Sequence, residues 1–248
     1  MRSLGIALRF LTRLPVPGGH EVDDATFAAS LAWYPAVGAL VGALLGALGL
    51  ALSATPLAPI LCAALVAVAA PLLTGGLHED GLADTFDGLG GGWTRERALE
   101  IMRDSRVGAY GAIALVAALL LRAAALAGMA PEAWAGALIV AHGVGRLAPV
   151  LLIAALPYAR GDAEGLAQPM VRGVLPWHVG VASLTALALA LGFGLPGLAA
   201  LGACGLITAA LGRWYWRRVG GITGDLAGAS VVAVELATLA VFAGVSPS

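Results

Sequence analysis

The sequence predicts an all-α, polytopic integral membrane protein with about seven transmembrane helices and a short N-terminal interfacial helix. Hydrophobic residues make up 60% of the 248 residues and charged residues only 12%, whereas a soluble domain carries roughly 25% charged residues. The charges fall in a few blocks between apolar runs of about 20 residues, the length that crosses the hydrocarbon of a bilayer. Residues 1–248 are therefore expected to form a single membrane domain in contact with lipid.

Residues 1–17 have the pattern of the interfacial helix. At about 100° per residue, three arginines fall on one stripe and four leucines cluster on the other side. The arginines are Arg2, Arg9 and Arg13, and the leucines are Leu4, Leu8, Leu11 and Leu14. Because arginines interrupt the apolar stretch and no small-residue cleavage site follows, we expect this segment to be retained rather than removed as a signal peptide.

Seven apolar segments are candidate spans. They run from Leu31 to Leu52, Pro59 to Leu77, Val107 to Gly128, Ala133 to Leu156, His178 to Leu195, Gly197 to Leu211, and Leu226 to Val245. Glycines and a proline within 192–197 predict a tight turn between the fifth and sixth, although one bent span with a re-entrant piece would leave the same signal. In the first span, Gly38, Gly42 and Gly46 recur every four residues and predict a face on which another helix packs closely.

Arginine alone carries the topology signal, because the chain has no lysine. The first, third and fifth loops contain no arginine, whereas the N-terminal segment and the second, fourth and sixth loops do. The arginines of these loops are Arg95, Arg97, Arg103 and Arg106, then Arg160 and Arg172, then Arg213, Arg217 and Arg218. The positive-inside rule therefore places the N-terminus and the even loops in the cytoplasm of a bacterium, beneath its inner membrane.

Charged residues inside the spans need partners. Arg146 falls near the middle of the fourth span, where a charge costs at least about 2.5 kcal/mol unless it faces a partner or a polar cavity. Glu235 in the last span is a candidate partner for Arg146. Arg122 lies nearer the outer end of its span and is expected to extend toward the headgroups.

The segment 78–106 is predicted to be an acidic, metal-binding loop on the cytoplasmic side. Asp80, Asp84 and Asp87 are spaced i, i+4 and i+7, so on a helix they would lie within about 60° of one another. Like charges at this spacing repel, and a cation between them would relieve the repulsion. Carboxylates without thiols suit a hard ion such as Mg²⁺, usually shared with substrate phosphates. The alternative is a solvated acidic loop.

Further polar residues occur in three other places. Arg103 and Arg106 flank Asp104 at the start of the third span and could neutralise phosphate oxygens, or could simply anchor the span at the headgroups. Thr223 and Asp225 precede the last span, where Asp225 could favour the helix dipole and Thr223 could cap the helix. In the fourth loop Tyr158, Arg160, Asp162 and Glu164 are either substrate contacts or a solvated turn.

These motifs resemble the cobalamin synthase (adenosylcobinamide-GDP ribazoletransferase) family. The similarity runs through nearly the whole chain in FLTRLPVP from Phe10, YPAVGALVG from Tyr34, GGLHEDGLADTFDG from Gly75, EIMRDSRVGAYG from Glu100, EGLA from Glu164 and GGITGDLAGA from Gly220. Two positions depart from the family pattern. Val232 stands where members often have a glutamate, and Glu79 where they usually have an apolar residue.

The resemblance implies a Mg²⁺-dependent transferase of cobalamin (vitamin B12) biosynthesis. Its substrates would be adenosylcobinamide-GDP and α-ribazole or α-ribazole 5'-phosphate, with GMP released. Asp80, Asp84 and Asp87 would hold Mg²⁺ on the diphosphate, and Asp104 would either complete the metal site or take the proton of the attacking hydroxyl. Substrate contacts would come from Arg103, Arg106, Arg146, Thr223 and Asp225.

Other functions remain as alternatives. A membrane CDP-alcohol phosphotransferase or a prenyltransferase would use similar aspartates on another diphosphate. A transporter would place its main charge cluster at the bilayer midplane, whereas the acidic segment here lies at the edge of the spans. With a net charge of −1 and no basic patch, nucleic acid is not an expected partner.

Overall fold

The computed structural model describes residues 2–18, 22–161, 165 and 167–245, and helices make up its regular structure. They are α1 (Arg2–Leu11), α2 (Asp24–Ala29), η1 (Ser30–Trp33), α3 (Tyr34–Ser53), α4 (Pro59–Thr74), α5 (Leu77–Gly91), α6 (Arg95–Ile101), α7 (Ala109–Ala127), α8 (Pro131–Gly145), α9 (Leu147–Ala155), α10 (Gln168–Gly173), α11 (Pro176–Gly192), α12 (Gly194–Val219) and α13 (Gly224–Val245). The chain is thus an all-α polytopic membrane protein, as the sequence predicts.

Each predicted apolar segment is helical. Five helical stretches in the described residues are long and apolar enough to cross a membrane, and a sixth is counted if the bent pair α4 and α5 forms one span. The remaining predicted span, α11, is apolar but shorter. The tight turn before α12 is confirmed, because Gly194 has a φ of 63°. The sixth segment is longer than expected, since α12 continues to Val219.

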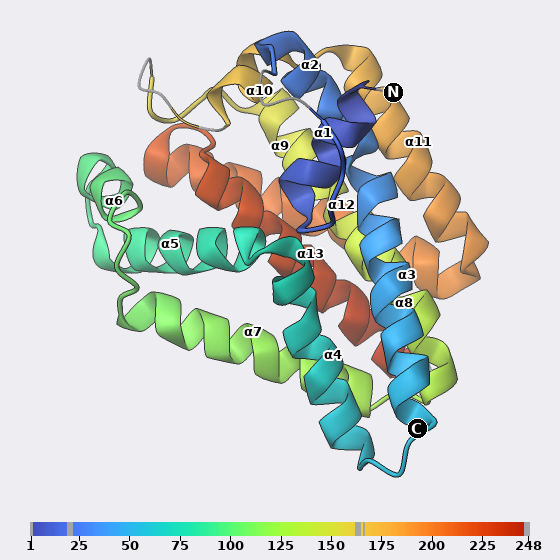
Figure 1. Cartoon of the computed structure of the whole chain (residues 1–248). Coiled ribbons are helices and arrows are strands. Elements are labelled where there is room, and N and C mark those ends of the chain that lie inside the picture. Colours follow the sequence, from blue (N-terminus) through green and yellow to red (C-terminus); the bar gives the residue numbers. More distant parts are fainter. Residues whose placement is uncertain (1, 19–21, 162–164, 166, 246–248) are drawn as a thin grey trace.

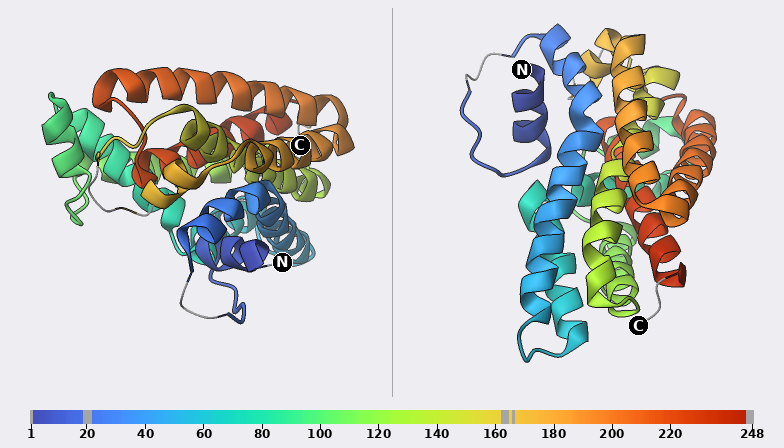
Figure 2. Two further views of the ribbon diagram at one scale, coloured as in Figure 1. Left: turned by 90° about the horizontal axis from the view of Figure 1, so that it is seen from above. Right: turned by 90° about the vertical axis from the view of Figure 1, so that its right-hand side faces the viewer.

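The helices form a bundle with most connections at its two ends (Figure 1). The α3–α4 and α7–α8 connections lie near the C-terminal end of α13, and the N-terminus lies at the opposite end beside the start of α11. Helix α1 lies against the outside of the bundle in both further views (Figure 2). Its Ile6, Ala7 and Leu11 are buried, so the apolar side of the predicted interfacial helix packs on protein.

The glycines of the first span form the contact between α3 and α8, as predicted. A Cβ atom on Gly46 would lie 2.7 Å from the Cα of Ala135. Cβ atoms on Gly42 and Gly38 would overlap the carbonyl oxygens of Leu138 and His142. The absence of side chains therefore lets the two backbones approach closely.

The segment 78–106 is not the loop that the sequence analysis expects. It contains α5 and α6, and α5 turns away from α4 by 93°. Gly75 and Gly76 make this corner with φ angles of 70° and 71°, a left-handed conformation that glycine adopts without a Cβ clash. The corner directs α5 across the bundle beside α7 and α13 (Figure 1).

Candidate active site

A cavity of about 330 Å³ lies between α5, α13 and the N-terminal helix, and we call it cavity A. One wall carries Asp80, Asp225 and Arg160, and other walls are aromatic or apolar. The lining residues are Phe10, Leu11, Tyr34, Leu77, His78, Asp80, Gly81, Pro149, Ile153, Tyr158, Arg160, Gly165, Ala167, Met170, Gly224, Asp225, Ala227, Gly228 and Val231. A mostly apolar cavity with a few convergent polar groups is the usual form of a ligand site.

Close packing of α5 on α13 brings the carboxylates of this wall together. A Cβ atom on Gly81 would lie only 2.7 Å from the carbonyl oxygen of Asp225, so glycine is required for this approach. Asp80 and Asp225 both line cavity A, and Asp84 is close enough to feel the charges of Asp225 and Asp80. The structure therefore brings Asp80 to the same wall as Asp225, which lies more than 140 residues later in the sequence, and Asp84 follows one turn farther along α5.

Arg160 is held against Asp225 by backbone pairing between two loops. The N–H of Ala159 donates to the carbonyl oxygen of Ile222 at 2.9 Å, and the N–H of Ile222 donates to that of Pro157 at 2.9 Å. The guanidinium of Arg160 then donates to the Asp225 carboxylate at 2.8 Å. The fourth and sixth loops thus contribute to one site.

Thr223 has a structural role at the start of α13. Its hydroxyl oxygen accepts a hydrogen bond from the N–H of Leu226 at 3.2 Å, and it is fully buried. This is the N-terminal capping that its residue type favours. Its hydroxyl also lies 3.3 Å from the Asp225 carboxylate, so Thr223 orients Asp225.

Asp87 is not brought to cavity A. Its carboxylate accepts hydrogen bonds from the backbone N–H groups of Gly108 and Gly111, at 2.7 and 2.9 Å. Both belong to the first turn of α7, where unpaired N–H groups and the helix dipole favour an anion. Asp87 therefore ties α5 to α7, and the predicted trio of metal ligands is not brought together around one point.

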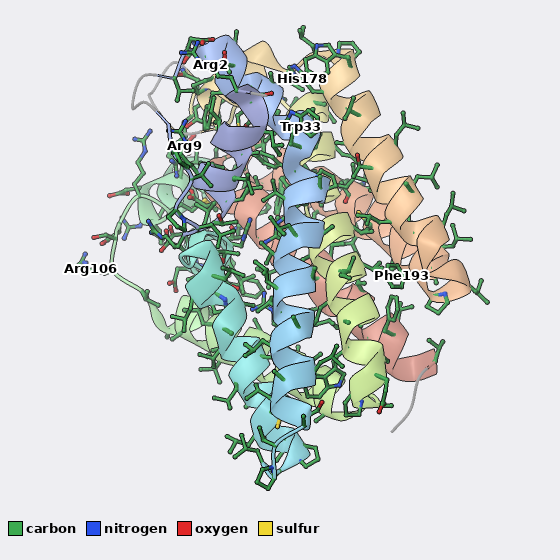
Figure 3. All side chains as sticks on the ribbon, turned by 45° about the vertical axis from the view of Figure 1, so that its right-hand side comes forward. Arg2, Arg9, Trp33, Arg106, His178 and Phe193 are labelled. Carbon is green, nitrogen blue, oxygen red and sulfur yellow. The ribbon has the colours of Figure 1, made fainter. Side chains whose placement is uncertain are left out.

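Asp104 and Arg106 form an exposed ion pair in the loop before α7. The Arg106 Nε lies 2.9 Å from the Asp104 carboxylate, and this guanidinium lowers the pKa of Asp104 to about 2. Arg106 projects outward from the molecule (Figure 3). Arg103 lines a different cavity of about 450 Å³, which also contains Arg160. These predicted site residues are thus not in cavity A, although Arg160 lines both cavity A and the cavity that contains Arg103.

Arg146 lies in a buried charge network rather than in cavity A. It is fully buried at the break between α8 and α9, and its Nη1 lies 2.7 Å from the Glu235 carboxylate. The predicted partner is therefore correct. Glu235 also accepts hydrogen bonds from Arg122 at 2.8 Å and contacts His142 at 2.7 Å.

The expectation for Arg122 was wrong. Its side chain is buried, and it bridges Glu235 and Glu79, at 2.8 Å from each. Arg122 could not be recognised as internal from its place in the sequence, because a position less than two turns from a span end does not show what packs around it. Glu79, which departs from the family pattern, thus has a buried partner. Val232 packs in a small apolar cluster with Leu82 and Ala118.

The carboxylates beside cavity A provide only part of the ligands that a Mg²⁺ ion needs. Within the residues that the structure describes, no group of three or more His, Cys, Asp or Glu side chains is arranged to hold a metal ion by itself. Mg²⁺ in phosphate chemistry is usually held by one or two carboxylates together with substrate phosphates and water. Asp80 and Asp225, which share a wall of cavity A, fit that mode, in which the substrate completes the site.

Sequence reasoning missed the aromatic wall of cavity A. Phe10 and Tyr34 both line it, with ring centroids 6.3 Å apart. Both belong to motifs in which the family resemblance was found, but the sequence analysis assigned neither of them a role. Asp162 and Glu164 of the fourth loop lie outside the described residues.

Comparison with known proteins decides the family. A sequence model of the family described as cobalamin-5-phosphate synthase matches residues 3–243. The chain belongs to this family. No solved structure matches the chain.

Similar cobalamin-5-phosphate synthase family members are each named adenosylcobinamide-GDP ribazoletransferase. The protein from Roseiflexus sp. (strain RS-1) is 42% identical over 96% of this chain and 87% of its own length. That of Leptothrix cholodnii is 46% identical over 95% of this chain and 92% of its own. That of Pseudomonas aeruginosa (strain PAO1) is 42% identical over 98% of both. The resemblance found in the motifs is therefore confirmed along the whole chain.

Proposed function

We propose that this chain is an adenosylcobinamide-GDP ribazoletransferase, a transferase of cobalamin biosynthesis that works in a bacterial inner membrane with cavity A open toward the cytoplasm. The similar proteins carry this name. The observation that carries the proposal from the structure is the convergence of Asp80 and Asp225 beside Arg160 in the wall of cavity A, with Asp84 one turn farther along α5. Carboxylates that can share a cation with a diphosphate, next to a guanidinium, are what phosphoryl transfer requires, since positioning and charge neutralisation supply most of its catalysis.

In the proposed reaction, a hydroxyl oxygen of α-ribazole or its 5'-phosphate attacks the phosphorus next to the cobinamide group. The bond from this phosphorus to the bridging oxygen breaks, and GMP leaves with that oxygen. Asp80, Asp84 and Asp225 would hold Mg²⁺, which would supply positive charge to the phosphate oxygens. Arg160, held on Asp225, adds a fixed positive charge at the same wall.

The proton of the attacking hydroxyl needs an acceptor, and the geometry of Asp104 makes it a poor one. Asp104 is ion-paired, and its lowered pKa of about 2 makes it a weak base. We therefore propose that a carboxylate of cavity A takes the proton, and that Asp104 orders the loop before α7 through Arg106. Arg103 and Arg106, in the second loop, do not line cavity A. They would therefore contact only a part of the substrate that extends beyond this cavity.

The test is turnover by purified protein in lipid. The protein is given adenosylcobinamide-GDP, α-ribazole and Mg²⁺, and the release of GMP and the corrinoid product are measured. Cytidine-linked alcohol donors and prenyl diphosphates serve as competing substrates. Turnover of these in place of the guanosine conjugate would favour the alternative transferases and refute the assignment.

A transporter is the second candidate, because Glu235, Arg122 and Arg146 place charges inside the spans, where ion pathways carry them. The arginines hold both oxygens of Glu235, and neither Glu235 nor Arg146 lines cavity A. A fixed network of this kind binds helices together. Uptake of a corrinoid or an ion by sealed proteoliposomes, without GMP release, would support transport instead.

A further inference from the structure

A second cavity borders the carboxylate of Asp80, on a different side from cavity A. It has a volume of about 610 Å³, and we call it cavity B. Phe10, Leu77 and Asp80 line both cavities. Asp80 therefore stands at the boundary between two spaces, one on the α13 side and one toward Val107 and Leu115 near and within α7. A reaction that joins two large substrates needs such access from two directions.

The two cavities differ in their chemistry. Cavity A has the aromatic rings of Phe10, Tyr34 and Tyr158 in its walls and suits a flat, uncharged group such as a nucleoside base. Cavity B is lined by two arginines, Arg9 and Arg13, and by the carboxylates of Asp80 and Glu79, of which Glu79 is paired with Arg122. Arg9 of α1 lines this cavity together with Gly75 and Gly76 of the corner between α4 and α5, and Figure 3 shows Arg9 beside the N-terminal helix. Guanidinium groups that share a cavity with a carboxylate able to bind a cation form a polar space suited to an anion with several oxygens.

Arg13 is held in place by the corner between α4 and α5. Its backbone N–H donates to the carbonyl oxygen of Leu73 at 2.8 Å. Its side chain lies directly over Gly75, where a Cβ atom would overlap the Nε of the guanidinium. Among the described residues, the structure records no hydrogen bond or ion pair for this side chain, and Arg13 is exposed in cavity B. Its donors are thus positioned by the backbone and available to a ligand.

We propose that cavity B binds the diphosphate of the nucleotide-activated substrate through Arg13, while cavity A receives the aromatic acceptor. This inference rests on the proposed function for the identity of the two substrates. Asp80 then lies where the transferred phosphate meets the acceptor hydroxyl. The N-terminal helix contributes to both subsites, because Phe10 faces both cavities and Arg9 faces cavity B.

The first experiment measures binding without turnover. Inorganic diphosphate with Mg²⁺ is titrated into the full-length protein in phosphatidylcholine vesicles, and Arg13→Gln is compared with wild type. Loss of a charge-assisted hydrogen bond is expected to weaken binding on the order of tenfold or more. Arg13→Lys keeps the positive charge but lacks the forked donors of the guanidinium. Its affinity for diphosphate should therefore lie between those of wild type and Arg13→Gln. Arg97→Gln, an exposed arginine outside both cavities, should bind as wild type does.

The second experiment assigns the substrate. Arg13→Gln should raise the KM for the GDP-activated donor on the order of tenfold and leave the KM for α-ribazole unchanged. Equal diphosphate affinity in wild type and Arg13→Gln, or a rise confined to the acceptor KM, would overturn the proposal. Diphosphate binding needs no turnover, so it tests cavity B even if the wild type fails to release GMP and the proposed function is wrong.

A phosphate could also come from a lipid headgroup. The donor KM of wild type and Arg13→Gln is therefore measured in pure phosphatidylcholine and again with added phosphatidylglycerol. We expect the same ratio between the two proteins in both. A defect that appears only with the anionic lipid would assign Arg13 to the membrane surface and refute the diphosphate site. Melting temperatures of the variants should match wild type, because the backbone contact of residue 13 is kept.

Discussion

Replacement of Glu235 by glutamine tests whether the buried charge network holds the bundle together. Glu235 has Arg146 and Arg122 on its two oxygens at 2.7 and 2.8 Å, with His142 at 2.7 Å. The substitution keeps the size of the side chain and removes its charge. Two guanidinium groups that are almost wholly buried then lose their shared anion.

The magnitude follows from burial. Removal of one partner from a buried ion pair costs about 3–5 kcal/mol, because an uncompensated charge is left in the interior. For a domain of this size that corresponds to a fall in melting temperature on the order of 10 °C. The network joins α7, α8 and α13, and through Glu79 it reaches α5, so the loss should weaken several helix contacts together.

The assay is thermal unfolding in lipid nanodiscs, followed by helical circular dichroism, with Glu100→Gln as the matched control. Glu100 pairs with Arg97 at 2.8 Å, but both side chains are more than half exposed. Exposed pairs contribute about 0–1 kcal/mol, so the control should unfold near the wild-type temperature. Equal melting temperatures for the two variants would refute the view that the network stabilises the bundle.

Four further outcomes are expected. Asp84→Asn should abolish GMP release without lowering the melting temperature, because it removes a metal-site charge and relieves repulsion; near-normal turnover with an unchanged Mg²⁺ midpoint would contradict the metal site. Asp87→Asn should lower the free energy of unfolding by about 1–3 kcal/mol, measured by chemical denaturation, because an NH2 group replaces one carboxylate oxygen and one of the two backbone N–H groups of α7 loses its acceptor. Gly42→Leu should separate α3 from α8 and lower stability by at least about 1–3 kcal/mol, and a wild-type melting curve would contradict the close contact. Arg106→Gln should return the pKa of Asp104 from about 2 toward its usual value. Asp104 then stays ionised in both proteins, so the pH–rate profile from about pH 5 to 8 should keep its shape. A shifted acid limb in this range would contradict the view that Asp104 is not the proton acceptor.

The sequence predicted the helices well because their signal is local. Each apolar run is long enough to recognise without knowing its neighbours, and the Gly38 to Gly46 spacing specifies a smooth helix face. The corner after α4 was not predicted. Gly75 and Gly76 can adopt a left-handed backbone conformation, but this freedom does not specify the direction that α5 takes.

The candidate site was predicted only in part, for the same physical reason. The spacing of Asp80, Asp84 and Asp87 gives their angles around a helix axis but not what lies beside each of them. Asp80 lines both cavities, whereas the carboxylate of Asp87 accepts hydrogen bonds from backbone N–H groups at the start of α7. Asp225 joins the carboxylates because α13 packs on Gly81, and a contact so distant in the sequence leaves no local pattern.

The glycine corner makes the chain sensitive to changes in length. One residue inserted between Gly76 and Asp80 would rotate the rest of α5 by about 100° and advance it by about 1.5 Å. Asp80 would leave Asp225, and Asp87 would leave the N–H groups of α7, in a single step. An insertion beside Trp93, which is 93% exposed after the end of α5, would move neither carboxylate. In a library of single-residue insertions, active clones should therefore be absent from the first turn of α5 and present around Trp93.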